Sequence, residues 1–302
     1  MRVFVTGASG FIGSAVVAEL LGAGHRVVGL ARSEQSAGAI AAAGAEVHRG
    51  TLEDLESLRA GAAASDGVIH LAYDHDFSRS RELAAVADAR AIEAMGDALA
   101  GSNRPILIAS GLGIAPGRVS TEADRAPLGW PRRASEEVVM ALAERSVRSA
   151  VVRLPPTVHG RGDKGFMQWL IAAARQHGHA AYIGDGSNRW PAVHRFDAAR
   201  VFRVGVERAT AGSILHAVAD EGVAVRDIAA SIARQLGVGV LAKSPDQAGD
   251  YFGFLAVLIG LDIPASSSWT RQQLDWRPVE PGLLADLDDG HYFATTASVA
   301  RA

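Results

Sequence analysis

The chain has 302 residues, long enough for a large core, and with 48% hydrophobic and 21% charged residues it has the composition of an ordinary soluble protein. A formal charge of -3 at pH 7 gives no electrostatic basis for binding nucleic acid or an anionic membrane, so we expect neither partner. The sequence contains no cysteine, which excludes disulfides, thiolate catalysis and cysteine-bound metal, and we expect no metal site.

The N-terminal segment and the most apolar run of the sequence indicate the cellular location that we expect. The first residues run directly into a predicted strand and turn, which leaves no room for a signal peptide, so we expect a cytoplasmic protein. The most apolar run, residues 252–263, is too short and too interrupted to span a bilayer, and we expect it in the core or in a substrate-pocket wall. The sequence leaves open whether the chain forms a homodimer.

The N-terminal segment predicts a strand, a glycine-rich turn and a helix in direct succession. Arg2–Thr6 reads as a buried strand, and Gly7, Gly10 and Gly13 follow it in the order G-A-S-G-F-I-G. Free backbone N–H groups and the positive end of the helix dipole would face an anion there, and a pyrophosphate fits. The glycines match a dinucleotide fingerprint: Gly7 permits the tight turn, Gly10 the approach of the ligand and Gly13 the packing of helix against strand. An ordinary strand-to-helix turn is the alternative.

Past this helix, predicted strands and helices alternate as far as residue 154. Apolar runs predict buried strands at residues 26–30, 46–49, 67–72, 105–110 and 150–154. Helices are predicted between them at about residues 36–43, 54–60, 81–100 and 135–144. The alternation indicates βαβ units with right-handed crossovers, and hence an α/β fold with a doubly wound parallel sheet. Pro155 and Pro156 end the sixth strand, because proline lacks the N–H that a strand ladder needs.

The pattern loosens in the C-terminal half. Helices are predicted at residues 166–176, 197–209 and 225–236, strands at 181–183 and 214–218, and a polar loop at 184–190. We interpret residues 1–158 as a dinucleotide-binding Rossmann domain, to which about residues 191–218 return. Residues 159–302 are interpreted as a smaller substrate-binding lobe.

Several motifs occur in an order that matches one family along nearly the whole chain. They are TGASGFIG at the start, GVIHLA in the fourth strand, VVRLPPTVHG after it, GDGSNRWPAVHRFDAAR, and LDWRP near the end. Together they resemble the extended short-chain dehydrogenase/reductase superfamily, in particular the NAD-dependent epimerase/dehydratase family. The resemblance implies a nicotinamide cofactor against the sheet and a substrate between sheet and lobe. The cofactor contacts that we expect on this basis are Gly7, Ser9, Gly10, Phe11, Ile12, Gly13, Leu52, Leu71, Ala72 and Pro155.

The residues after the second strand indicate which dinucleotide is bound. An acid there would bind the ribose 2′-hydroxyl of NAD(H), whereas an arginine accommodates the 2′-phosphate of NADP(H). The chain has Arg32 and Ser33 at this place and no acid before Glu34. We therefore expect NADP(H) as the preferred cofactor, with Arg32 and Ser33 among its contacts. NAD(H) stays open, because a solvated Arg32 is the alternative.

The usual catalytic motif of the superfamily is absent. It is Y-x-x-x-K on one helix, where the lysine lowers the pKa of the tyrosine and holds the ribose, and the tyrosine exchanges a proton with the substrate oxygen. Counting from the fifth strand brings this segment to residues 131–135, which read PRRAS, and none of the four tyrosines has a lysine four residues on. Ser110 is the candidate hydroxyl partner. The chain therefore resembles the atypical members of the superfamily.

Replacements for the tyrosine are expected beyond the carboxyl ends of the strands, where ligands lie in a doubly wound sheet. Tyr73 and His75 follow the fourth strand, and Asp74 and Asp76 beside the histidine would raise its pKa and fix its tautomer. A solvated loop is the alternative for this segment. His159 is a third candidate for the proton donor, with a packing role as its alternative.

Arg189 and Trp190 are the candidates for substrate contacts. They lie in the predicted polar loop, at the position where sugar-nucleotide enzymes of the family hold a phosphate. An arginine next to a tryptophan could clamp an anionic or planar small molecule. We therefore expect a small-molecule substrate.

Three functions are compatible with these residues. The main hypothesis is an NADP(H)-dependent oxidoreductase that acts on a small carbonyl, imine or enone compound with a non-standard proton donor. The second is a sensor or scaffold that binds NADP(H) without turnover, because both residues of the catalytic pair are missing. The third is a nucleotide-sugar epimerase or dehydratase, which is disfavoured because oxidation of a sugar hydroxyl depends most on the tyrosine base.

Overall fold

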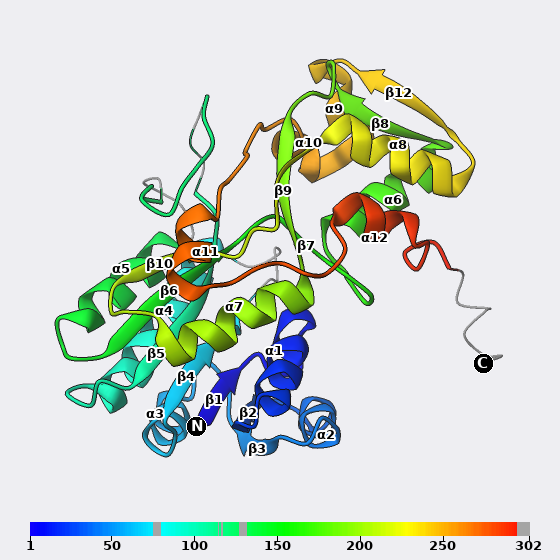
Figure 1. The fold of residues 1–302 in the computed structure, drawn as a ribbon. Helices are drawn as coiled ribbons and strands as arrows, with labels where there is room; N and C mark the ends of the chain where they lie inside the picture. Colours follow the sequence, from blue (N-terminus) through cyan, green and yellow to red (C-terminus); the bar gives the residue numbers. More distant parts are fainter. Residues whose placement is uncertain (75–79, 114, 116, 127–131, 295–302) are drawn as a thin grey trace.

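Seven strands form a central sheet with helices on both faces (Figure 1). The structure is a computed structural model that describes residues 1–74, 80–113, 115, 117–126 and 132–294. The strands of the sheet run in the order β10-β6-β5-β4-β1-β2-β3, and each neighbouring pair is parallel. They are β1 (Arg2–Thr6), β2 (Arg26–Ala31), β3 (Glu46–Arg49), β4 (Gly67–His70), β5 (Pro105–Gly111), β6 (Arg148–Leu154) and β10 (Ser213–His216). The predicted doubly wound α/β fold is confirmed.

The sheet separates two apolar cores, because successive residues of a strand point to opposite faces. Val3 and Val5 of β1 lie in one core with α1, α2 and α7, whereas Phe4 lies in the other with α3, α4 and α5. The helices on the first face are α1 (Phe11–Gly22), α2 (Glu34–Ala42) and α7 (Arg195–Arg208). Those on the second face are α3 (Leu55–Ala63), α4 (Arg81–Leu99) and α5 (Arg133–Ala143).

The position of β1 fixes where a ligand can lie. This strand has β2 on one side and β4 on the other, so the strand order reverses beside it. In an open α/β sheet such a reversal leaves a crevice at the carboxyl ends of the strands, because the adjoining loops turn to opposite faces. The glycine turn after β1 therefore opens at this crevice.

A separate apolar cluster forms the core of a lobe, at the upper right of Figure 1. Its elements are α6 (Phe166–His177), β8 (His179–Ile183), α8 (Val225–Leu236), β12 (Gly239–Lys243), α9 (Pro245–Phe252), η1 (Gly253–Leu255), α10 (Ala256–Ile259) and α12 (Leu283–Asp288). A three-stranded sheet has the order β11-β9-β7, formed by β11 (Asp220–Ala224), β9 (Arg189–His194) and β7 (Thr157–His159). Helix α11 (Ser268–Leu274) lies against β10 and α7. The proposed domain boundary at residue 158 stays a prediction.

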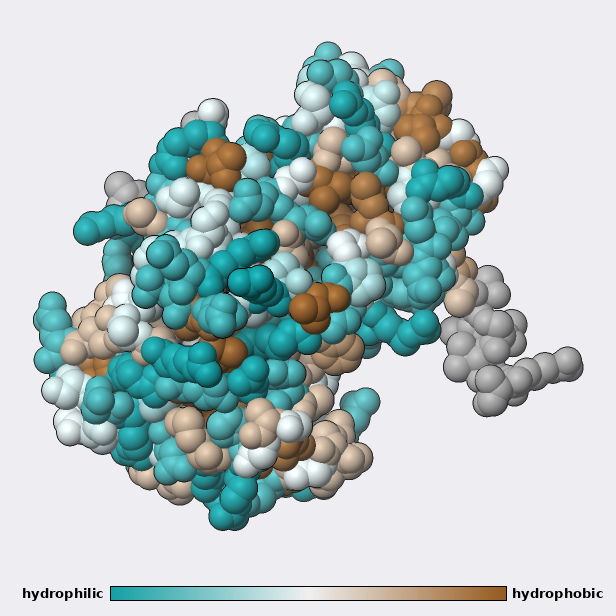
Figure 2. Space-filling model, in the orientation of Figure 1, coloured by the Kyte–Doolittle hydropathy of each residue, from teal (hydrophilic) through white to brown (hydrophobic). Residues whose placement is uncertain are grey.

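The most apolar segment of the sequence belongs to this lobe. Phe252, Leu255 and Ile259 are buried in its core, whereas Phe254 and Val257 are exposed. In Figure 2 hydrophobic residues gather over the lobe around α10 and α12, while the surface over the central sheet is mainly hydrophilic on this face. Among the helices that the structure describes, none combines the length and the apolar character needed to cross a membrane.

The predicted polar loop at residues 184–190 is wrong at its C-terminal end. Arg189 and Trp190 begin β9, where Trp190 pairs with Val223 of β11 and its side chain is fully buried. The strands β7, β11 and β12 were not predicted at all, because three to five residues next to turns carry too little periodicity to be recognised.

A buried ion pair joins α5 to the sheet. Arg153 of β6 and Glu136 of α5 are both buried, and the guanidinium donates two hydrogen bonds to the carboxylate, at 3.0 and 2.7 Å. The same guanidinium donates to the carbonyl oxygen of Asp124 at 2.6 Å. The charges of Arg153 and Glu136 therefore balance each other in the protein interior. Burying either charge without its partner would be costly.

Replacing Glu136 by alanine should lower the free energy of unfolding by about 3–5 kcal/mol, because the Arg153 charge stays buried without its partner. Glu137→Ala is the matched control: Glu137 pairs with Arg133 on the surface, and its loss should cost less than about 1 kcal/mol. Chemical denaturation of both variants measures the difference. Equal losses would contradict a structural role for the buried pair.

Candidate functional site

The glycine turn after β1 is close-packed at two of its three glycines. Gly7 has a φ of +68°, and a Cβ there would lie 2.7 Å from the backbone nitrogen of Ala72. A Cβ on Gly13 would lie 1.9 Å from the carbonyl oxygen of Gly7. Gly13 thus allows α1 to approach the turn itself. Any side chain at either position would push α1, β1 and β4 apart.

The third glycine keeps the start of α1 open. Gly10 is the N-cap of the helix without a side-chain cap, and the first turn of α1 contains no acidic residue. Among the described residues other than its chain neighbours, a Cβ on Gly10 would approach one atom within 4 Å, the carbonyl oxygen of Gly7 at 3.1 Å. Ser9 and Gly10 are exposed and Phe11 and Ile12 are half-buried. The Gly10 N–H donates to the Gly7 carbonyl oxygen at 2.9 Å, so it is the N–H groups of Ser9, Phe11 and Ile12, together with the helix dipole, that an anion could meet.

An arginine that the sequence reasoning missed adds positive charge beside this turn. Arg195, the first residue of α7, has its guanidinium 4.7 Å from the centre of the Phe11 ring and donates a 2.8 Å hydrogen bond to the Ser14 hydroxyl. The sequence alone could not predict that Arg195 lies beside the glycine turn, because α1 and α7 are far apart in the chain and come into contact only in the folded structure.

The end of β4 lies directly against the glycine turn. The Thr6 hydroxyl accepts hydrogen bonds from the backbone N–H groups of Leu71 and Ala72, each at 3.2 Å. These two predicted cofactor residues are thus brought beside Gly7. Pro155 is buried directly after β6, and Leu52 is half-buried against the core beside β2. The cofactor contacts themselves stay predictions.

The region after β2 is arranged as a positively charged corner. Arg32 is exposed and forms no ion pair with any residue that the structure describes, and Ser33 caps α2 by accepting a hydrogen bond from the N–H of Ser36. Glu34, the nearest acid, pairs with Arg49 at 2.7 Å, and the hydrogen bond and charge of Arg49 lower the pKa of its carboxyl. The acid that would otherwise repel a 2′-phosphate is therefore neutralised.

A buried polar network lies behind the crevice, and the sequence reasoning missed its central members. The Asp88 carboxylate of α4 accepts hydrogen bonds from His70 Nε2 at 3.1 Å and from the Ser135 hydroxyl. His70 Nδ1 lies 2.8 Å from the Thr6 hydroxyl. Burial raises the pKa of Asp88, but the hydrogen bond of His70 and the charge of Arg132 outweigh it, so the pKa stays below its usual value. Asp88 is therefore an anion that can only accept, so His70 Nε2 is the donor in their hydrogen bond.

Arg132 connects this network to Tyr73. Its guanidinium donates to the carbonyl oxygen of Ala109 at the end of β5 and lies 3.4 Å from the Asp88 carboxylate. The guanidinium carbon also lies 4.1 Å from the centre of the Tyr73 ring. In the segment where the superfamily has Y-x-x-x-K, the fifth position, Ser135, is bonded to Asp88, and Pro131 lies outside the described residues.

The other candidates for the proton donor have different surroundings. His75 lies outside the described residues. Ser110 is buried at the end of β5, and its hydroxyl has no hydrogen-bond partner within the described part of the chain. His159 is fully buried, with Nδ1 at 2.9 Å from the Asp286 carboxylate and its ring edge-on to His194. This favours the packing role that was the alternative for His159.

The two predicted substrate residues are already engaged within the lobe. Arg189 binds Asp262 through Nε at 3.1 Å and Nη2 at 2.9 Å, so its charge is balanced. Trp190 is fully buried against the ring of Phe166, because β9 turns its side chain into the lobe core. A substrate contact by Trp190 is therefore disfavoured, and one by Arg189 stays a prediction.

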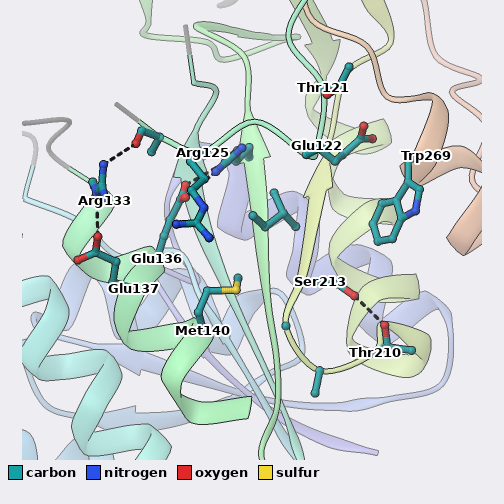
Figure 3. A pocket seen from close by; sticks show the side chains of 16 residues that line it. Thr121, Glu122, Arg125, Arg133, Glu136, Glu137, Met140, Thr210, Ser213 and Trp269 are labelled. Carbon is teal, nitrogen blue, oxygen red and sulfur yellow. Dashed lines mark hydrogen bonds and ion pairs between the residues drawn. The ribbon is translucent and has the colours of Figure 1, made fainter. Parts of the chain in front are cut away.

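A cavity of about 740 Å³ lies on the α5 side of β6 and β10, away from the glycine turn (Figure 3). Its labelled side chains are Thr121, Glu122, Arg125, Arg133, Glu136, Glu137, Met140, Thr210, Ser213 and Trp269. None of the predicted cofactor contacts lines it. Arg133 is paired with Glu137, and the buried Arg153 with Glu136, so most of its charges are matched within the protein.

The comparison with known families agrees with this geometry. The model of the NAD dependent epimerase/dehydratase family matches residues 3–217, from β1 to the residue after β10. The chain belongs to this family. An uncharacterised protein of Schizosaccharomyces pombe is 47% identical over 296 residues, which cover 97% of this chain and 100% of that protein. The match spans the lobe as well as the sheet.

A second relative and a solved structure that resemble this chain carry names that state an activity. A 4-hydroxy-2-methyl-3-oxo-4-farnesyl-3,4-dihydroquinoline-1-oxide ketoreductase of Stigmatella aurantiaca is 32% identical over 193 residues, 58% of this chain and 55% of that protein. The crystal structure of a dTDP-glucose 4,6-dehydratase of Streptomyces venezuelae with NAD bound has a TM-score of 0.75 at 18% identity, covering 96% of each chain. The family and the ketoreductase support an oxidoreductase-type enzyme, and the family supports a nicotinamide dinucleotide as its cofactor; the dehydratase structure shows the shared fold.

The residues of the crevice fit such a cofactor. The start of α1 has no side chain at Gly10 and no side-chain cap, and an uncapped helix N-terminus of this kind is the surface that a pyrophosphate needs. Ser9, Phe11 and Ile12 would hold the pyrophosphate through their backbone N–H groups, and Gly10, whose own N–H is bonded to Gly7, would let the ligand approach. Leu71 and Ala72 would line the same crevice from β4.

Gly10→Val should abolish the binding of both NADH and NADPH, because the branched side chain fills the space at the helix end. The fold should survive, since the Cβ of residue 10 approaches only one atom and at 3.1 Å. Gly22→Ala, in the last turn of the same helix and with no atom within 4 Å of the new Cβ, is the control and should bind normally. Nucleotide fluorescence gives the affinities and circular dichroism the folding. Unchanged affinity in Gly10→Val would refute the site.

Proposed function

We propose that the protein is an NADP(H)-dependent oxidoreductase that acts on a small carbonyl, imine or enone compound, with Tyr73 as the proton donor. The observation that carries the proposal is the position of Tyr73, which directly follows the cofactor-lining end of β4 and lies under the guanidinium of Arg132. A phenol and a fixed cation thus stand together at the carboxyl ends of β4 and β5. The named ketoreductase among the relatives supports carbonyl chemistry.

The chemistry needs one hydride and one proton. When bound, the reduced nicotinamide supplies the hydride to the carbonyl carbon. Tyr73 gives its phenolic proton to the carbonyl oxygen, so one O–H bond breaks at the phenol and another forms on the product alcohol. Solvent returns the proton to the phenolate. The buried hydroxyl of Ser110, which has no hydrogen-bond partner among the described residues and lies at the end of the neighbouring strand, is the candidate to orient the substrate oxygen.

The preference for NADP(H) rests on Arg32. Its guanidinium is exposed beside the second strand, and Arg49 already neutralises Glu34. The 2′-phosphate then meets positive charge rather than an acid.

Arg32→Ala should weaken NADPH binding by roughly 1.5–3 kcal/mol, the contribution of charged hydrogen bonds, and leave NADH binding nearly unchanged. Arg26→Ala is the matched control, because Arg26 begins the same strand at its other end and pairs with Glu46. Fluorescence titration with both nucleotides measures the four affinities. Equal losses for NADH and NADPH would contradict recognition of the 2′-phosphate.

Tyr73→Phe should lower kcat by about 10²- to 10⁴-fold, the range of general acid catalysis, while the affinity for NADPH stays the same. The pH profile of kcat separates this proposal from a role for His75. A histidine acid loses activity as the pH rises past about 6.5, or somewhat higher beside carboxylates, whereas a tyrosine acid keeps activity to much higher pH. If only His75→Ala lowers kcat, the assignment to Tyr73 is wrong.

The function itself is tested by following NADPH absorbance with a panel of ketones, aldehydes, imines and enones. Turnover of one class supports the oxidoreductase and names the substrate group. Inertness toward all of them, with tight NADPH binding, favours a sensor or scaffold instead. Conversion of a UDP- or dTDP-sugar with retained NADH would favour an epimerase or dehydratase.

A further inference from the structure

The guanidinium of Arg132 is held on two sides at once. Its Nη2 donates to the Ala109 carbonyl oxygen, its Nη1 lies 3.4 Å from the Asp88 carboxylate, and its Cζ lies over the Tyr73 ring, 4.1 Å from the ring centre. The Arg132 side chain is only 11% exposed. A planar cation held by a strand end and a buried anion is fixed in place, so the phenol beneath it is fixed as well.

The segment that takes the place of the usual motif, residues 131–135, contains no lysine. The chain has two lysines, Lys164 and Lys243. Lys164 is exposed just before α6, and Lys243 ends β12 in the lobe, with its ammonium 5.3 Å from the Tyr251 ring. Arg132 lies in the very segment from which the lysine of the motif is missing, and its guanidinium carbon lies 4.1 Å from the centre of the Tyr73 ring.

We propose that Arg132 is a positioning residue that takes over the electrostatic task of the missing lysine, acting on the phenol of Tyr73 from a different element. The catalytic consequence rests on the proposed function, but the effect on the phenol does not. Arg132 orients the ring and stabilises the phenolate left when the proton is transferred. Because arginine does not lose its proton in proteins, this charge persists at every working pH.

Several charged and titratable groups surround Tyr73 in the described part of the chain. Arg132 lies over the ring, Asp88 and His70 lie behind Arg132, and Asp74 follows Tyr73 in the sequence. The Asp88 carboxylate is shared among Arg132, His70 and Ser135, so its charge is spread over three donors. A guanidinium in contact with the ring favours the phenolate over the phenol, and this is the effect that the titration below measures.

The first test is a titration that needs no substrate. The near-ultraviolet phenolate absorbance of the wild type minus that of Tyr73→Phe isolates Tyr73 from the other three tyrosines, and its midpoint should lie below about 10, the ordinary tyrosine value. When the same difference titration is made with Arg132→Gln present in both proteins, its midpoint should rise by about 1–3 pH units. Arg132→Lys should restore most of the shift. Arg133→Gln, which removes a neighbouring arginine paired with Glu137, should change nothing.

A purely structural role for Arg132 would leave the midpoint where it is. A wild-type midpoint at or above about 10 overturns the proposal even if Arg132→Gln fails to fold, because this measurement needs no arginine variant. A midpoint that is unchanged in a folded Arg132→Gln protein overturns it equally.

The second test reads the same effect in catalysis. For reduction, the limb of the kcat profile that falls with pH should move to higher pH in Arg132→Gln, with kcat lowered and the affinity for NADPH kept. If the titration shifts but no carbonyl compound is turned over, the proposed function fails and the role of Arg132 stands. If turnover is present and Arg132→Gln leaves its pH profile unmoved, the role of Arg132 fails and the function stands.

Discussion

The contact between Gly7 and Gly13 is the constraint on which the rest of the site depends. A single methyl group at Gly13 would overlap the Gly7 carbonyl oxygen at 1.9 Å, so α1 can start this close to β1 only with glycine there. The same turn brings Gly7 against Ala72 and so sets the end of β4. Because Tyr73 is the next residue, the position of the proposed acid follows from the packing of the turn.

Beneath this turn, the buried anion of Asp88 ties four elements together. The Asp88 carboxylate of α4 accepts hydrogen bonds from His70 of β4 and Ser135 of α5. Thr6 of β1 joins the network through its hydrogen bond with His70. A buried carboxylate is expensive unless its oxygens are all satisfied, and here each oxygen receives at least one donor. The network therefore resists movement of α4 and α5 relative to the strand ends, which keeps Arg132 aligned with the Tyr73 ring.

The sequence predicted the sheet well because strand-helix alternation is a local signal. The glycine turn and the strands at residues 67–72 and 105–110 needed only their own residues to be recognised. Asp88 and His70 escaped recognition, because a histidine in an apolar strand and an acid on a helix acquire meaning only when the fold brings them together. Trp190 was misread for the opposite reason: its polar neighbours suggested a loop, whereas pairing with β11 turned it into the lobe core.

The missing Y-x-x-x-K motif therefore does not imply a missing catalytic pair. A motif on one helix encodes two side chains that the helical spacing already brings together, whereas a pair drawn from the ends of β4 and α5 leaves no trace in spacing. What the chemistry requires is a phenol, a fixed cation and a cofactor crevice in mutual contact, and backbone position is free to vary as long as this contact is kept. In the arrangement that we propose, the cation stands next to the position where the tyrosine of the motif would be, and the phenol comes from the segment after β4.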